Sequence, residues 1–382
     1  MSPERGTSIA VFVAATVSDD TEILQIRVDG GIRATDRGWG QRMQVEELSH
    51  IDADLLDRLV GVASAKYYGG ELELRHLTQH RRGSSVRYLV ARDARGRPLG
   101  LAPVYTATPE WDDAVDPTAI FEPPVHMTPA ELCLAGSPGT YENYLTVAAS
   151  ARGSEAALVA RALAEGSRSL ARNAGCAYVM FPYLADQQAL WLEEYRAAAT
   201  AIHVRHKGVL PLIWDTFEDY VAWLPRKRRT EVRRERHRFL QSGIVVREQP
   251  LVDVATEVAP LMAQTETRYG KNFAPAQIAA YFMLLGTHLD EDCFALVAHK
   301  NDRPIASSVV LGCGDRWVVR GWGCDYAAIG DDYLYFNLVY YEPIMRAIER
   351  GVELLDFSVG ALSAKRWRGC ATERLQTILI PA

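Results

Sequence analysis

The sequence predicts an α/β protein with two similar domains, each built on a mixed, largely antiparallel sheet. The chain has 382 residues, more than one hydrophobic core usually serves, so two domains are expected. Its composition, 48% apolar and 24% charged residues, is typical of globular proteins. The two halves also repeat one order of elements, namely helices, a run of strands, a helix and a strand. Together these observations favour duplication of one α/β unit.

The first half contains this order between an early helix and a late apolar strand. Apolar periodicity and turn residues predict a helix over 45–65, a hairpin of strands 86–90 and 98–106, a helix over 154–172 and a strand over 176–183. Ser154 is expected to cap the alanine-rich helix and Gly175 to end it. We therefore expect a first domain over 45–214, with residues 1–44 as an N-terminal extension packed on it.

The second half repeats the order with longer elements. The expected helices cover 217–241, 254–269, 277–289 and 333–350, and the expected strands cover 244–249, 293–299, 304–313, 316–323 and 353–359. Three strands in succession predict an antiparallel meander. Pro343 predicts a kink in the last helix, because proline removes one backbone hydrogen bond. These elements define an expected second domain over 215–382.

Composition and charge exclude several classes of protein. The longest apolar stretch near the N-terminus, 9–15, is shorter than the ~20 residues of a membrane-spanning helix, so no span is expected. Six dispersed cysteines without a Cys-x-x-Cys pair indicate reduced core residues and a cytoplasmic protein rather than disulfides or a metal site. A net charge of −6 argues against a general polyanion-binding surface but leaves room for a local basic patch.

A basic patch of this kind lies between Arg226 and Arg238, where eight Arg or Lys residues are opposed only by Glu231 and Glu235. On a helix, the inward row of this segment is only partly apolar: 221, 224, 228, 232, 235 and 239. A solvated helix with internal ion pairs is one interpretation. The other is contact with nucleic-acid phosphates, made by Arg226, Lys227, Arg228, Arg229, Arg233 and Arg234.

Two further stretches carry candidate functional residues. The first is Arg320-Gly-Trp-Gly-Cys-Asp325, followed by the expected helix at Tyr333, whose N-terminal amides would suit a carbonyl, carboxylate or phosphate. Core packing is the alternative role for the tyrosines of that helix. The second is the glycine-bracketed segment 360–369, an expected basic loop. Its Lys365 and Arg368 form an anion site or are ordinary surface charges.

The order of these motifs resembles the FemABX-like branch of the GNAT acyltransferase superfamily. The resemblance covers about 215–382 and rests on Asp219 to Arg229 with Arg233 to Arg236, Thr267-Arg-Tyr-Gly270, Arg320-Gly-Trp-Gly323, Tyr340-Tyr341 with Ala347 to Gly351, and Lys365-Arg-Trp-Arg-Gly369. Members of this branch include aminoacyl-tRNA-dependent transferases. The resemblance implies tandem GNAT-like (FemABX-type) domains, with the transfer site in the second.

Roles for single residues follow from these stretches and the resemblance. The candidate catalytic residues are Lys365, Arg368 and Tyr335. The candidate substrate-binding residues are Trp322, Asp325, Tyr333, Asn337 and Tyr269. Relatives in one subgroup carry His and Glu where this chain has Tyr335 and Asn337, so their acid–base role does not carry over and the catalytic base stays open. No metal or other cofactor is expected.

Three functions compete for this sequence. An aminoacyl-tRNA-dependent transferase would use tRNA as donor and a small-molecule (biosynthetic or cell-wall-like) acceptor with an amine or hydroxyl, and it explains the basic segment. An acyl-CoA-dependent N-acyltransferase is the alternative, although 326–330 is a poor substitute for the Gln/Arg-x-x-Gly-x-Gly/Ala loop of such enzymes. The third is a non-catalytic recognition module. Hydrolase, metalloprotease and Walker motifs are absent from the sequence, and the tRNA-dependent transferase is favoured.

Overall fold

The computed structural model describes residues 11–18, 21–28, 43–61, 83–106, 115–136, 145–330 and 332–382. The chain forms two compact units. Within the described ranges, unit 1 runs from 11 to 205 and adds 374–382, and unit 2 comprises 206–373. None of the helices in these ranges is both long and apolar enough to cross a membrane.

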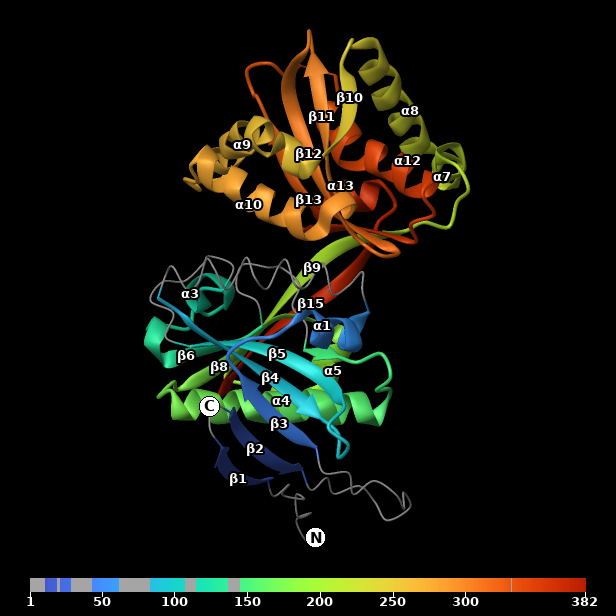
Figure 1. Ribbon diagram of the computed structural model, residues 1–382. Coiled ribbons are helices and arrows are strands. Elements are labelled where there is room, and N and C mark those ends of the chain that lie inside the picture. The colour runs from blue at the N-terminus through green and yellow to red at the C-terminus, as the bar shows by residue number, and fades with distance from the viewer. Residues whose placement is uncertain are drawn as a thin grey trace. The chain divides into compact units, whose positions relative to one another are not determined.

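Unit 1 consists of short helices, one long helix and a sheet (Figure 1). Its strands are β1 (Val11–Ser18), β2 (Thr21–Val28), β3 (Gln44–Leu48), β4 (Ser85–Arg92), β5 (Pro98–Thr106), β6 (Leu132–Ala135), β7 (Thr146–Val147) and β8 (Tyr178–Ala185). Its helices are α1 (Ala53–Val60), α3 (Pro117–Ile120), η1 (Pro129–Glu131), α4 (Ser154–Asn173), α5 (Asp186–Trp191) and α6 (Glu193–Ala197). Two strands, β9 (Ala201–Pro211) and β15 (Ala371–Pro381), contribute residues to both units.

The sheet of unit 1 has the order β1-β2-β3-β4-β5-β6-β8-β15, and β7 pairs with β5. The β6–β8 pair is parallel, and the other pairs described in this sheet are antiparallel. A parallel pair needs a crossover, and α4 lies in that connection. Val159 and Leu163 of α4 pack with Leu99 and Phe181 in the core. Apolar side chains therefore pack the crossover helix α4 against the sheet of unit 1.

Unit 2 is built from longer elements. Its helices are α7 (Phe217–Trp223), α8 (Arg226–Gln241), α9 (Leu251–Arg268), α10 (Pro275–Leu289), η2 (Asp290–Asp292), α11 (Leu334–Phe336), the π-helical turn η3 (Asn337–Tyr341), α12 (Glu342–Glu349) and α13 (Leu362–Trp367). Its strands are β10 (Val245–Pro250), β11 (Cys293–Lys300), β12 (Arg303–Cys313), β13 (Arg316–Cys324) and β14 (Leu354–Val359), in the order β9-β14-β13-β12-β11-β10.

The two faces of this sheet carry different helices, as the upper part of Figure 1 shows. Along β11, Phe294 and Leu296 join the core formed with α7, α8, η3 and α12, whereas Ala295 and Val297 join the core formed with α9 and α10. This alternation follows from the two-residue period of a strand. Both faces are buried, which explains the nearly continuous apolar runs of the strands.

Close packing of α9 on β13 depends on Gly323. A Cβ atom at this position would lie 2.4 Å from the backbone nitrogen of Met262 and 2.7 Å from the carbonyl carbon of Leu261. Both contacts are shorter than any normal approach of a Cβ atom. The Gly-Trp-Gly motif thus allows a helix to approach one side of the strand, while Trp322 packs against the core that contains η3.

β13 and β14 form the parallel pair of unit 2 but stay together only briefly. Their pairing joins Arg316 to Leu354, Trp317 to Leu355 and Val318 to Asp356, after which β13 continues to Cys324 and β14 to Val359. The other pairs described in this sheet are antiparallel, which confirms the expected mixed, largely antiparallel fold. α11, η3 and α12 make the crossover between the two strands.

Three expectations about local structure are wrong. Residues 45–48 belong to strand β3 rather than to a helix, because they pair with β4, and residues 62–65 lie outside the described ranges. The expected helix 217–241 is two helices, α7 and α8, separated at Leu224-Pro225, because proline disfavours the helical conformation of the residue before it. The expected basic loop 360–369 contains the helix α13.

Smaller differences concern the ends and the interior of helices. Gly153, not Ser154, is the N-cap of α4, while Gly175 follows its end with the expected positive φ of 76°. Pro343 follows the wider π-helical turn η3. A π-helical turn accommodates the lost hydrogen bond, so the irregularity expected at Pro343 takes this form.

The expected domain ranges remain predictions. Each unit contains a crossover helix between two parallel strands, β6 and β8 in unit 1, and β13 and β14 in unit 2. The division into units falls within β9 and within β15. Of the expected N-terminal extension, residues 1–10, 19–20 and 29–42 lie outside the described ranges.

Candidate functional site

A buried ion pair joins two segments of unit 2 that are far apart in sequence. Arg368, just after α13, donates from Nη2 to Oε2 of Glu235 on α8 at 2.9 Å. Tyr341 of η3 also donates its hydroxyl to Glu235. The side chains of Glu235 and Arg368 are 3% and 7% exposed, so each charge depends on the other for its stability in the interior.

Aromatic rings surround the Arg368 guanidinium. Its Cζ lies 3.7 Å from the ring centre of Phe336, 4.9 Å from that of Tyr340 and 5.5 Å from that of Tyr341. These distances are in the range of cation–π attraction. Burial raises the pKa of the Tyr341 hydroxyl well above its usual value, so this group stays a neutral donor. The arrangement holds η3 and α13 together.

Lys365 is the second buried cation of this segment. Its Nζ donates to the backbone carbonyls of Ser358 at 2.7 Å and Val359 at 2.8 Å. Burial lowers the pKa of Lys365 to about 8, while Cys370 and Asp356 act in the opposite direction. A charged lysine has three donors, and two of them are bound here. The ammonium group is therefore fixed in place while keeping one N–H for a further acceptor.

A second buried cluster lies directly beside Lys365. Asp356 on β14 accepts from Nζ of Lys207 at 3.0 Å and also pairs with Arg316. Lys207 makes a further ion pair with Glu373 at 3.2 Å. The two cations lower the pKa of Asp356 against the opposing effect of its burial. Asp356 is thus a buried carboxylate that stays ionised.

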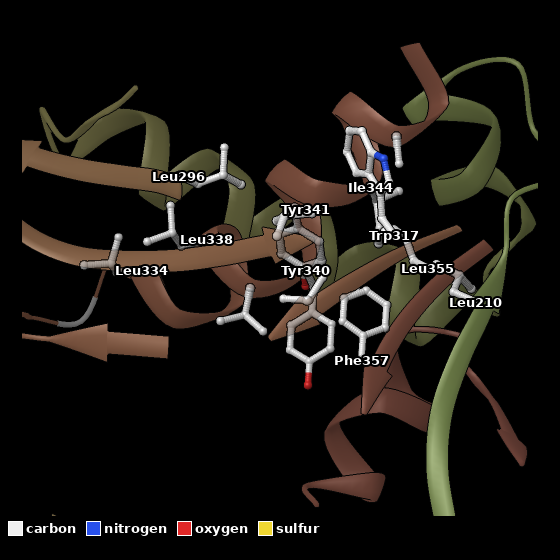
Figure 2. Packing of buried hydrophobic residues seen from close by; sticks show 14 of the residues in the cluster. Leu210, Leu296, Trp317, Leu334, Leu338, Tyr340, Tyr341, Ile344, Leu355 and Phe357 are labelled. Atoms are coloured by element: carbon white, nitrogen blue, oxygen red, sulfur yellow. The ribbon is translucent and has the colours of Figure 1, made fainter. Parts of the chain in front are cut away.

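Aromatic side chains line the start of the crossover between β13 and β14. Trp322 and Tyr335 are in edge contact, with ring centres 5.1 Å apart, and Tyr335 also contacts Phe336 and Tyr340. Figure 2 shows Tyr340 beside Phe357, and their ring centres are 4.9 Å apart. Burial raises the pKa of Tyr335, and Tyr269 adds to this effect. Two candidate residues, Trp322 and Tyr335, thus lie together next to the Arg368 cluster.

The remaining candidate substrate-binding residues lie in different surroundings. Asn337 is fully buried and links α8 to η3, since it accepts from Arg236 at 2.9 Å and donates to the Tyr333 carbonyl. Asp325 accepts from Arg303 at 2.7 Å and from the backbone of the turn after β13. Tyr269 is 74% exposed at the end of α9.

The cations of α8 divide into anchored and exposed groups. Arg236 is half-buried against Glu342, and Arg229 donates to the Leu224 carbonyl. Arg228 donates to the Arg366 carbonyl and lies over the Trp367 ring. The exposed cations of the helix are Arg226, Lys227, Arg233, Arg234 and Arg238.

Aromatic rings accompany the cationic surface of α8 at two places. Lys227 and Arg228 lie 5.4 and 5.0 Å from the ring centre of Trp367, which is 39% exposed. Arg234 and Arg238 lie 5.7 and 6.0 Å from the ring centre of Tyr333. We call the five exposed cations with Trp367 and Tyr333 the α8 surface. Cations beside partly exposed rings are typical of surfaces that hold nucleic acids.

Sequence reasoning missed the buried partners of these candidates. Glu235 was expected to neutralise neighbouring arginines on a surface helix, whereas it lies in the core with Arg368. A signal was present, because Glu235 stands in the inward row of α8 between the buried Val232 and Phe239. Asp356 and Lys207 gave no comparable sign, since each lies in a strand whose pairing is set by residues far away in the chain.

The fold and these side chains define the class of the protein. A meander, a crossover helix and a parallel strand that soon leaves its neighbour form a GNAT-type unit, as the sequence motifs implied. A family model described as peptidoglycan biosynthesis/recognition matches residues 145–377. The chain therefore belongs to the FemAB-like family. Family and fold together indicate an acyltransferase of the GNAT superfamily.

Solved structures agree with this fold at low sequence identity. The crystal structure of FemX matches with a TM-score of 0.56 and 13% identity, over 86% of this chain and 96% of that chain. A C-terminal domain from Agrobacterium fabrum, described as part of a candidate lysylphosphatidylglycerol synthetase, gives 0.52 and 9%, over 86% and 92%. A conserved protein of unknown function from Bacteroides thetaiotaomicron gives 0.51 and 14%, over 85% and 97%. No curated protein matches the sequence.

Proposed function

We propose that the protein is an aminoacyl-tRNA-dependent transferase, which moves an aminoacyl group to the amine or hydroxyl of a small-molecule acceptor. The description of its family supports an acceptor of biosynthetic or cell-wall type. The observation that carries the proposal is the α8 surface. Five exposed cations on one helix of a chain with a net charge of −6 favour a local polyanionic partner.

The chemistry that this reaction needs is modest. An aminoacyl ester is already activated, so the enzyme has to align the acceptor against it and stabilise the negative charge that develops on the carbonyl oxygen. Lys365 suits the second task, because its ammonium group is held by two carbonyls and keeps one donor. Tyr335 of α11 and Trp322 of β13 would contact the substrate. Arg368 acts by holding the surrounding rings and η3 in place.

The salt dependence of tRNA binding tests the role of the α8 surface. With about four phosphate contacts, the logarithm of affinity should fall with the logarithm of salt concentration at a slope of about −3 to −4. Replacing Arg226, Arg233 and Arg234 by glutamine should flatten the slope by about 2–3. These three cations are better positions for substitution than Arg229. Arg229 donates to the Leu224 carbonyl, so its replacement would change the stability of the protein as well as tRNA binding. The pair of Arg233 with Glu218 is exposed and contributes at most about 1 kcal/mol, so the triple variant should fold.

A matched triple variant controls for the loss of three positive charges. Arg58, Arg95 and Arg247 are exposed and lie outside α8, and their replacement by glutamine should leave the slope within experimental error. Equal slopes for both triple variants, or salt-independent tRNA binding by the unmodified protein, would reject the role of the α8 surface. The absence of tRNA binding by the unmodified protein would reject the tRNA donor and favour the acyl-CoA-dependent alternative.

A further inference from the structure

The backbone that holds the Lys365 amine is itself in an unusual conformation. Ser358 has a φ of +58°, a region that side chains with a Cβ atom seldom adopt. It lies in a β-bulge, because β14 advances from Asp356 to Val359 while its partner β9 advances only from Val209 to Lys207. The bulge brings the carbonyls of Ser358 and Val359 to Nζ of Lys365. This disfavoured backbone conformation of Ser358 requires a stabilising contact.

Asp356 provides this stabilising contact through one of its two carboxylate oxygens. Its Oδ1 accepts from the backbone N–H of Ser358 at 2.6 Å, while Oδ2 binds Lys207 and Arg316. The cations come from β9 and β13, so the carboxylate links three strands. Asp356 is also the last residue of β14 that pairs with β13. It therefore fixes the point from which the two strands continue separately.

We propose that Asp356 is a positioning residue, which holds the left-handed turn at Ser358 and thereby orients the Lys365 amine toward the reacting group. The proposal rests on the function proposed for Lys365. It also accounts for both oxygens of this buried carboxylate. Oδ2 neutralises Lys207 and Arg316, whereas Oδ1 binds the backbone of the turn at Ser358.

The packing around Lys365 makes the position of its amine sensitive to this turn. A Cβ atom at Gly208 of β9 would lie 2.6 Å from Cδ of Lys365, so the strand closes on the aliphatic part of the side chain. The charged and titratable groups near the amine are Asp356 from β14 and Cys370 after α13, with Lys207, Arg316 and Glu373 bound around the Asp356 cluster. The two carbonyls of the turn bind Nζ while β9 confines the aliphatic part, so the turn sets the position of the amine.

The first test replaces Asp356 by asparagine, which keeps the shape and removes the charge. The variant loses the negative neighbour that raises the pKa of Lys365, so the amine should lose its proton at lower pH. A fall of one pKa unit from about 8 would lower turnover at pH 8 by about fivefold, if the ammonium form is active. KM for the acceptor should not change. The pKa itself is read from lysine labelled with ¹³C at Cε, with the signal assigned by Lys365→Arg.

Glu373→Gln is the matched control. Glu373 binds the same Lys207 but has a side chain that is 49% exposed and makes no contact with Ser358. Its replacement should leave the pKa of Lys365 and the pH profile of turnover unchanged. Equal shifts in Asp356→Asn and Glu373→Gln, or no shift in either, would overturn the positioning role.

A second pair of variants acts on the turn without altering the ion cluster, which keeps the test decisive if Asp356→Asn fails to fold. Ser358→Gly tolerates a positive φ and should leave the pKa of Lys365 near 8, whereas the β-branched Ser358→Val disfavours that conformation and should lower both the pKa and turnover. Identical pKa values in the two variants would refute the proposal. A shifted pKa with unchanged turnover would instead retain the positioning of the amine and reject the function proposed for Lys365.

Discussion

Each unit has a crossover that joins two parallel strands, but the two crossovers differ in their buried charges and in the regularity of their helices. In unit 1, α4 is an uninterrupted helix whose buried face is mainly alanine and other apolar residues. Glu165 is the one buried charged side chain among the described residues of that unit that follow β2. In unit 2, the crossover contains a π-helical turn, and the buried charged residues around it include Glu235, Arg368, Lys365 and Asp356.

The buried charges and the irregular turn of unit 2 lie in one place in the fold. Burying a charge is unfavourable unless it is paired and hydrogen-bonded, and irregular turns are also disfavoured. Around α4, the described residues of unit 1 show one buried charge, Glu165, which pairs with the partly exposed Arg168 and Arg172, and no π-helical turn. Unit 2 concentrates both next to β13 and β14. We therefore propose that the unit 2 crossover is the place of chemistry, and three measurements test the contrast.

The largest effect should come from breaking the ion pair of unit 2. Arg368→Met leaves Glu235 buried without its cation, which should lower the free energy of unfolding by about 3–5 kcal/mol. The matched change in unit 1 is Arg172→Met, which removes a half-exposed partner of Glu165 and should cost about 1 kcal/mol or less. Urea-induced unfolding followed by circular dichroism measures both. Similar losses in the two variants would remove the energetic contrast between the crossovers.

The next effect concerns pH and the buried amine. Burial lowers the pKa of Lys365 from 10.5 to about 8, so between these pH values the unfolded chain binds a proton that the folded chain does not. Stability from this group should rise with pH across that window, by about 2–3 kcal/mol. Lys365→Met should lack the rise. The free energy of unfolding is therefore compared between the two proteins at pH 7 and at pH 10, and parallel pH dependences would show that Lys365 is not held in a desolvated site.

A smaller contrast involves two glycines at which a helix approaches a strand. Gly323→Ala directs a methyl group at the backbone of α9 at 2.4 Å, whereas the shortest approach in Gly100→Ala is to the Val159 side chain on α4, with the Thr146 carbonyl oxygen at 3.0 Å. Backbone yields less easily than side chains, so we expect losses of about 3 kcal/mol and about 1 kcal/mol. Gly330→Ala, whose nearest neighbour is 3.9 Å away, should be neutral. Thermal unfolding orders the three variants, and the reverse order would contradict the packing described for α9.

The sequence was most informative where local patterns decide structure. The meander of β11 to β13 and the helices α4 and α9 follow from periodicity and turn residues such as Asn301 and Asp302, both of which have positive φ. The break at Pro225 and the helix α13 were missed, because a dense run of charges outweighed the proline and two glycines suggested a loop. These errors move element boundaries but leave the fold class unchanged.

The candidate site was less accessible to sequence reasoning. Lys365 and Arg368 stood out as cations near glycines, but Glu235, the partner of Arg368, lies 133 positions away in the chain. In the neighbouring cluster, Lys207 and Asp356 are 149 positions apart. Pairings of this length depend on which strands become neighbours, and no local pattern contains that information. The same holds for the bulge at Ser358, which arises from the register of β14 on β9.

The most direct test of the proposed activity measures what the protein consumes. Purified protein is offered tRNA charged with radiolabelled amino acids, or labelled acyl-CoA, together with a panel of small amines and alcohols, and products are identified by mass spectrometry. We predict that label leaves aminoacyl-tRNA for an acceptor, that this transfer weakens as salt is raised, and that Lys365→Met lowers it by about 100-fold. Transfer from acyl-CoA with no consumption of charged tRNA would contradict the proposal.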